Sequence, residues 1–157
     1  MSAFEGCPGS SMQDFRSKNG EVKEDTGRRE SHLRQWPIQL HLVSPEAPYY
    51  QKADVLLSAD CVAYTVGDFH KDYLKGKSVA IACPKLDEGQ DEYVEKIKSL
   101  IDDAKINTLT VMIMQVPCCG GLVAMAEQAL HSAKRKVPVK SIVVSLQGDI
   151  LSEDWVT

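Results

Sequence analysis

The sequence predicts a three-layer α/β sandwich of the Rossmann-like kind, built on a mostly parallel sheet of about five strands. Two patterns lead to this prediction. Short runs of aliphatic and β-branched residues recur along the chain, and stretches with helical periodicity separate them. Strands that alternate with helices imply right-handed βαβ crossovers, which make the strands parallel and place helices over the sheet.

The apolar runs are nearly continuous rather than alternating, which is typical of strands that are covered on both faces. The strands they predict cover residues 38–43, 53–59, 78–82, 108–116 and 139–146. Two segments between them, 91–104 and 121–134, gather their apolar side chains on one helical face. A shorter helical turn is expected over residues 68–74.

Composition limits the possible classes of protein. The chain has 157 residues, 43% of them hydrophobic, which is enough for one domain with a sizeable core. Its net charge of −4 argues against a nucleic-acid binder, which needs an excess of Lys and Arg. We see no signal peptide, and no apolar run approaches the roughly 18 residues of a membrane span. The expectation is a soluble, cytoplasmic protein that binds neither nucleic acid nor a membrane.

The N-terminal part differs from the rest. Residues 16–30 are dense in charges of both signs and poor in apolar side chains, so they cannot bury enough surface to offset the entropy of ordering. We therefore expect a flexible segment over residues 1–31, with a Cys-Pro-Gly-Ser turn at 7–10 and a charged linker. The α/β domain is expected over residues 32–157.

The positions of the cysteines are the most informative feature. There are five, an odd number, in a chain without a secretory signal, so a disulfide framework is not expected. Cys61, Cys83 and the Cys118–Cys119 pair each follow directly after a predicted strand. Because the carboxyl ends of parallel strands lie at one edge of a sheet, four thiols from three crossovers should meet where such folds bind ligands.

Four sulfurs that meet in this way suit a metal centre, either tetrahedral zinc or an iron–sulfur cluster. The Cys-Pro pairs and the segment 117–122, Pro-Cys-Cys-Gly-Gly-Leu, favour an iron–sulfur cluster, for which we expect the [4Fe–4S] type. Amides of Gly120 and Gly121 at a helix N-terminus would stabilise its negative charge. Adjacent cysteines point in different directions, so one of Cys118 and Cys119 can be a packing residue, with Cys7 as a replacement ligand. Three ligands would leave an open iron for substrate, whereas four would suit electron transfer.

Three other residues lie near the predicted cysteine edge. His70 is a candidate proton donor or outer-shell partner, with a solvated or capping histidine as the alternative. Lys85 follows Cys83 and could balance the charge of a cluster, although an ordinary surface role is open. Asp60 could hydrogen-bond the edge or cap a helix.

The chain also resembles the C-terminal domain of ferredoxin-like 4Fe-4S binding proteins of anaerobic bacteria and archaea. The matching stretches run from Cys7 to about residue 146: Cys7-Pro-Gly-Ser, LRQWPIQLHLV (33–43), Ala-Asp-Cys (59–61), Asp-Phe-His (68–70), CPKLD (83–87) and PCCGGL (117–122). The resemblance implies an iron–sulfur and redox setting, with a separate ferredoxin or other redox protein, or a second copy of the chain, as partner. In that family a two-cluster ferredoxin module usually precedes the domain, but this chain has no CxxCxxCxxxCP run.

Three functions are open at this point. The first is an iron–sulfur protein of electron transfer or redox chemistry, as part of an oxidoreductase. The second is a metal-free thiol redox or sulfur-carrier enzyme that uses Cys118 and Cys119, for which reactive thiols of low pKa are expected. The third is a zinc-stabilised interaction module.

Overall fold

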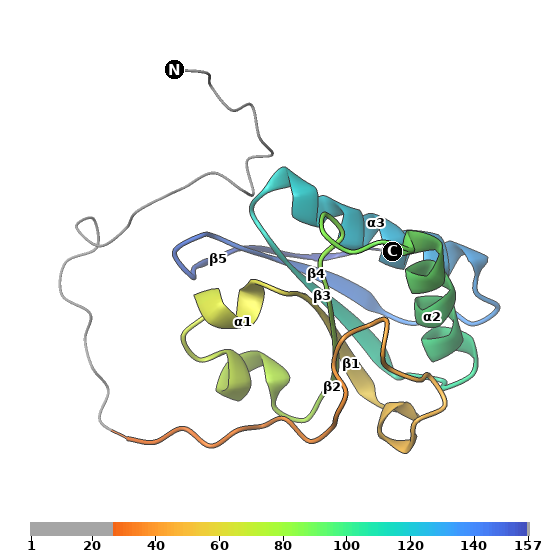
Figure 1. The fold of residues 1–157 in the computed structure, drawn as a ribbon, viewed down its shortest axis with the longest axis horizontal. Helices are drawn as coiled ribbons and strands as arrows, with labels where there is room; N and C mark the ends of the chain where they lie inside the picture. Colours follow the sequence, from red (N-terminus) through yellow and green to blue (C-terminus); the bar gives the residue numbers. More distant parts are fainter. Residues whose placement is uncertain (1–26, 157) are drawn as a thin grey trace.

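The computed structural model describes residues 27–156 and shows a five-stranded sheet in the order β2-β1-β3-β4-β5 (Figure 1). Strands β1 to β4 are parallel, and β5 is antiparallel to β4. The predicted α/β sandwich with a mostly parallel sheet of five strands is confirmed. Of the predicted segment 1–31 only residues 27–31 are described, and Cys7 lies outside the described residues.

The strands are β1 (Asp54–Ala59), β2 (Ser78–Ala82), β3 (Thr108–Met114), β4 (Val139–Val144) and β5 (Ile150–Trp155). Four of them coincide with predicted apolar runs. The fifth was missed because its sequence, ILSEDW, is polar and mostly exposed. The predicted strand 38–43 is wrong: the N–H groups of Leu42 and Val43 both bind the Gln39 carbonyl, so the chain turns after a single bridge from Gln39 to Ile81.

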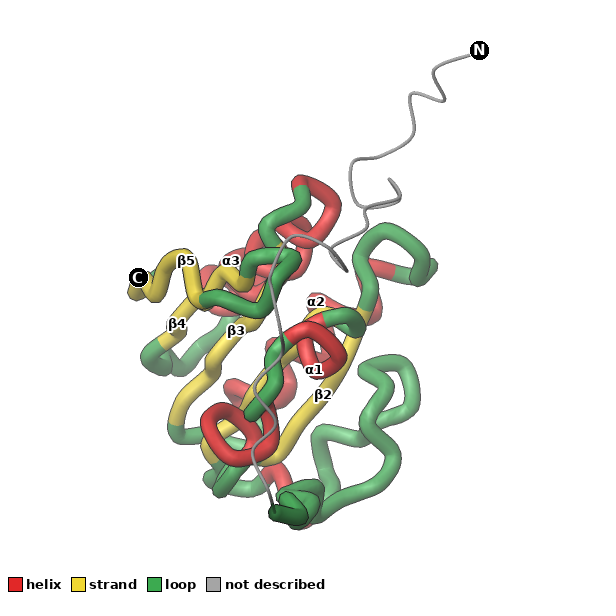
Figure 2. Tube along the Cα trace, turned by 90° about the vertical axis from the view of Figure 1, so that its left-hand side faces the viewer, coloured by secondary structure: helices red, strands yellow, loops and turns green. Residues whose placement is uncertain are grey.

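The two faces of the sheet carry different helices. On one side lie α2 (Gln90–Asp102) and α3 (Gly120–Ser132), which also contact each other (Figures 1 and 2). On the other side lie α1 (Val62–Thr65) and the single turn η3 (His70–Leu74). Right-handed crossovers require this arrangement, because the chain passes from β1 to β2 in one direction and from β2 to β3 in the other.

The core follows the expected periodicities. Every residue of β1 after Asp54 is buried, as predicted for a central parallel strand. Helix α2 buries one face, formed by Tyr93, Val94, Ile97, Leu100 and Ile101.

The turn between β4 and β5 touches the end of α1. A Cβ on Gly148 would lie 2.6 Å from the Thr65 carbonyl oxygen. Only glycine, which also has φ +94° here, permits this approach.

Strand β2 lies at the edge of the sheet, and the segment that precedes β1 covers its free side. The Gln35 side chain donates to the Val79 carbonyl (2.9 Å) and accepts from the Val79 N–H (2.6 Å), so its amide acts as a short piece of neighbouring strand. Ile38 and Leu40 then pair with Ile81 through backbone hydrogen bonds of 2.8 and 2.9 Å. Covering the edge in this way protects it from pairing with another chain.

Within the described residues no helix is long and apolar enough to cross a membrane. The cytoplasmic location stays a prediction.

Candidate functional site

The order of the strands places a topological switch point between β1 and β3. From β1 the chain leaves toward β2 on one side, and it returns from α2 to β3 on the other. In open α/β sheets the crevice at the carboxyl ends of two such strands is the usual ligand site. Asp60 and Cys61 follow β1 here, and the single turn η4 (Pro117–Cys119) comes two residues after β3. Cys61 and the Cys118–Cys119 pair therefore flank the switch point, whereas Cys83 follows the neighbouring strand β2.

Three of the thiols form a group, which we call the thiol cluster: Cys61, Cys83 and Cys119. Burial raises the pKa of Cys61 most, and the neighbouring Cys83 and Asp60 raise it further. The pKa of Cys119 is likewise raised, first by burial and then by the charges that Cys61 and Cys83 would carry as thiolates. Each of these thiols acts electrostatically on another, so loops after three different strands place them within electrostatic range of one another.

The members of the thiol cluster differ in accessibility. Cys61 is exposed at the start of α1, Cys83 is half-buried, and Cys119 is buried with 8% of its surface exposed. The adjacent Cys118 is half-buried and makes a hydrogen bond with the Cys119 side chain, but it is not among the groups that shift the pKa of Cys61. Cys118 therefore contacts Cys119 but is not a member of the thiol cluster.

A closed loop fixes the position of Cys83. The Asp87 carboxylate accepts a hydrogen bond from the Cys83 N–H (2.9 Å) and another from the Tyr93 hydroxyl, while the Asp87 N–H donates to the Cys83 carbonyl (2.8 Å). Burial and the Asp87 hydrogen bond raise the pKa of Tyr93, so that the phenol stays a donor. Lys85 lies on this loop and is exposed.

The two glycines at the start of α3 have different surroundings. A Cβ on Gly121 would lie 3.3 Å from the Cβ of Pro84, whereas a Cβ on Gly120 would meet nothing within 4 Å. The absence of a side chain at Gly121 thus lets the loop after Cys83 pack on the N-terminus of α3.

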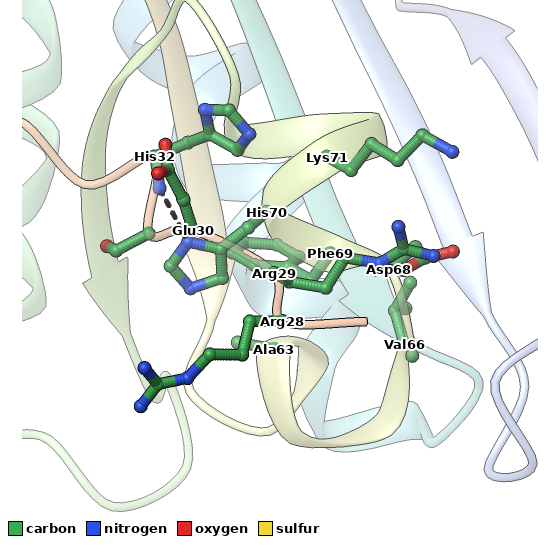
Figure 3. A pocket seen from close by; sticks show the side chains of 12 residues that line it. Arg28, Arg29, Glu30, His32, Ala63, Val66, Asp68, Phe69, His70 and Lys71 are labelled. Atoms are coloured by element: carbon green, nitrogen blue, oxygen red, sulfur yellow. Dashed lines mark hydrogen bonds and ion pairs between the residues drawn. The ribbon is translucent and has the colours of Figure 1, made fainter. Parts of the chain in front are cut away.

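His70 lies on η3, and its Nδ1 accepts a hydrogen bond of 3.0 Å from the His32 N–H (Figure 3). Its ring also packs edge-on against Phe69. The residue thus anchors the segment before the sheet to the α1 side of the molecule. Arg29 also forms an ion pair of 3.3 Å with Asp68, which attaches the same segment to the turn just before η3.

Two cavities adjoin His70. The outer cavity, of about 490 Å³, lies between residues 28–32 and residues 63–71 (Figure 3). The inner cavity, of about 350 Å³, lies between β1, β2 and η3 and has mainly apolar walls. Asp60 is part of the inner wall, and its Oδ1 is buried without a hydrogen-bond partner in the described structure. The sequence suggested that Asp60 either forms a hydrogen bond at the cysteine edge or caps a helix. The N-cap of α1 is Cys61, so Asp60 does not cap this helix.

The thiols do not fit the expected metal centre. Among residues 27–156, no three or more Cys, His, Asp or Glu side chains are arranged to hold a metal ion. The described residues therefore provide no set of ligands for an iron–sulfur cluster or for a zinc ion. The identity of a cofactor stays a prediction.

Comparison with known proteins corrects the proposed relationship to ferredoxin-like proteins. Residues 47–157 match the model of a family described as Rossmann-like domain. An uncharacterized protein of Archaeoglobus fulgidus is 30% identical over 120 residues, which cover 75% of this chain and 82% of the relative. No solved structure matches. Neither description mentions iron–sulfur, electron-transfer or oxidoreductase proteins, so that classification is wrong, and the chain belongs to the Rossmann-like domain family.

Proposed function

We propose that the protein is a metal-free thiol redox protein in which Cys61 and Cys119 form a reversible disulfide. The observation that carries this proposal is that an exposed thiol, Cys61, and a buried thiol, Cys119, follow the two strands of the β1/β3 switch point and lie within electrostatic range of each other. An exposed thiol can meet a reactant from solution, and a buried neighbour can then resolve the product within the chain. The sequence-based choice of Cys118 as the partner of Cys119 is less well supported, because Cys61 is the accessible member.

The reaction is a thiol–disulfide exchange in two steps. The Cys61 sulfur, after losing its proton to solvent, attacks a disulfide R–S–S–R, so that a Cys61–S–S–R bond forms and RS⁻ leaves and takes up a proton. The Cys119 sulfur then attacks Cys61, the intramolecular disulfide forms, and the second RSH is released. The two cysteines are oxidised by two electrons in total, and the external disulfide is reduced to two thiols.

The electrostatics of the thiol cluster favour a slow response rather than fast turnover. The expected low pKa of the thiols is wrong: the pKa values of Cys61 and Cys119 are both raised, so the reactive thiolates are scarce at neutral pH. Such a site suits a protein that registers the redox poise of the cytoplasm, where thiols are otherwise kept reduced.

Exposed apolar side chains flank the cluster and support a protein as the external disulfide. Tyr64, 95% exposed, lies on α1 three residues after Cys61, and Leu86, 79% exposed, lies on the loop three residues after Cys83. Solvent-facing aromatic and aliphatic residues beside a reactive group are typical of contact surfaces. We propose that they receive the partner redox protein that presents its disulfide to Cys61.

The proposal is tested by equilibrating the whole chain in glutathione buffers of increasing oxidation and counting alkylated thiols by mass spectrometry. We expect two thiols to be lost together in one transition. Cys61→Ser should abolish the transition, whereas the matched control Cys118→Ser should retain it. Retention of every thiol across the series, or single glutathione adducts without loss of a second thiol, would overturn the proposal.

A further inference from the structure

The inner cavity carries a second inference, independent of the thiol reaction. Its floor is formed by alternate residues of two neighbouring strands, Ser58 of β1 with Val79 and Ile81 of β2. Its roof is formed by η3 and by the segment that contains Leu33 and Ile38. Aliphatic and aromatic walls with very few polar groups are typical of pockets that bind small organic molecules.

One polar group in this wall is unsatisfied. Asp60 Oδ1 is buried and has no hydrogen-bond partner among the described residues, which is costly for a carboxylate. Nearby charges do not compensate it: burial raises the pKa of Asp60, and the neighbouring acidic Asp87 raises it further. The described residues that line the cavity include neither Lys nor Arg.

The remaining wall suits a positive charge. Phe69 and Tyr64 line the same cavity, and aromatic faces attract ammonium groups. His70 in the same wall already accepts a hydrogen bond at Nδ1 from the His32 backbone N–H. A carboxylate without a partner, aromatic side chains and an apolar volume together describe a receptor for a cation with a hydrophobic body.

We propose that the inner cavity binds a small organic cation, a primary ammonium group on an apolar or aromatic body, with Asp60 as its counter-ion. The ammonium lies against the Asp60 carboxyl group, and the body lies between the η3 turn and the β1–β2 surface. The segment over residues 32–38 closes the cavity, held by the His32 to His70 hydrogen bond and by the Gln35 contacts with Val79.

The test uses benzylammonium as the probe and benzyl alcohol as its uncharged counterpart, with binding measured by calorimetry and by NMR shifts of cavity residues. We expect benzylammonium to bind the native chain more tightly than the alcohol. Asp60→Asn keeps the shape of the side chain and should weaken benzylammonium binding roughly tenfold or more, because a charge-assisted hydrogen bond is lost. Binding of the alcohol should stay unchanged.

Two further variants complete the experiment. Ala63→Trp, at an exposed position in the cavity wall, should block both probes without disturbing the core. Cys61→Ser should bind benzylammonium as the native chain does, so that failure of the thiol proposal leaves this one testable. Equal affinity for the two probes, an unchanged affinity in Asp60→Asn, or shifts confined to residues outside the cavity would overturn the proposal.

Discussion

Helices α2 and α3 cover one face of the sheet with thirteen residues each, whereas α1 and η3 cover the opposite face with four and five. The first face is closed by two regular helices that pack on each other. The second is completed by an irregular segment, and both cavities beside His70 lie there. The comparison shows that regular helices supply the stability of the domain, while short elements leave space and unsatisfied polar groups on which a ligand can act.

The largest effect should come from a matched pair of leucines on the two faces. Leu100 on α2 and Leu74 on η3 are both buried, with 1% and 2% of their surface exposed. Leu100→Ala should lower the free energy of unfolding by about 3–5 kcal/mol, since it opens a void in a close-packed layer. Leu74 already borders a cavity, so Leu74→Ala should cost less, about 2–3 kcal/mol. Urea denaturation measures both, and equal losses would contradict the difference between the faces.

A second prediction concerns Tyr50, whose hydroxyl donates to the Val79 carbonyl and accepts from the Gln35 amide. Burial raises the pKa of Tyr50 from 10.0 to about 12. The unfolded chain therefore loses this proton at a lower pH than the folded one, and stability that is complete below pH 10 is lost as the pH rises toward 12. We expect the loss to be roughly 2–3 kcal/mol.

The measurement compares unfolding of the native chain and Tyr50→Phe between pH 9 and 12. The variant lacks the ionisable group, so its stability should fall less steeply over this interval. Parallel curves would show that Tyr50 ionises alike in both states.

Removal of the Gln35 amide should have a smaller effect. Gln35→Ala takes away the acceptor of the Val79 N–H, although the Val79 carbonyl keeps its bond from Tyr50. The expected cost is about 1–2 kcal/mol, because one partner of a partly buried hydrogen bond is lost. Hydrogen exchange at the Val79 amide should accelerate in the same variant. Gln35→Glu, which keeps the acceptor oxygen, is the matched control and should retain more of the protection.

These contacts show which parts of the architecture are predictable. Buried strands such as β1 and amphipathic helices such as α2 are written in local periodicity, so sequence reasoning finds them. Strand β5 and the turn at Gln39 are not, because pairing at the edge of a sheet depends on distant segments. Gln35 illustrates this dependence, since its partner Val79 lies 44 residues further along the chain.

The site was predictable to a similar degree. The convergence of Cys61, Cys83 and Cys119 follows from their places at the ends of parallel strands. The raised pKa values do not, because burial of sulfur and repulsion between thiols are set by the packed loops. The orphaned oxygen of Asp60 is equally invisible in sequence, since it results from the lack of a nearby donor among residues 27–156.

The smallest predicted effect concerns the reactivity of Cys61. Because Cys83 raises the pKa of Cys61, Cys83→Ser should increase the rate of Cys61 alkylation at pH 7 by roughly twofold to tenfold. In the native chain the rate should rise steeply as the pH approaches and passes 9. Cys118→Ser serves as control and should leave the rate unchanged, whereas a slower reaction in Cys83→Ser would contradict mutual repulsion within the thiol cluster.

The most direct test of the thiol site is a peptide map of the whole chain after equilibration with oxidised glutathione and quenching in acid. We predict a single intramolecular link that joins the peptide of Cys61 to the peptide of Cys119. A link between Cys61 and Cys83 would contradict the choice of resolving thiol, and a map without any link to Cys61 would contradict the thiol redox function itself.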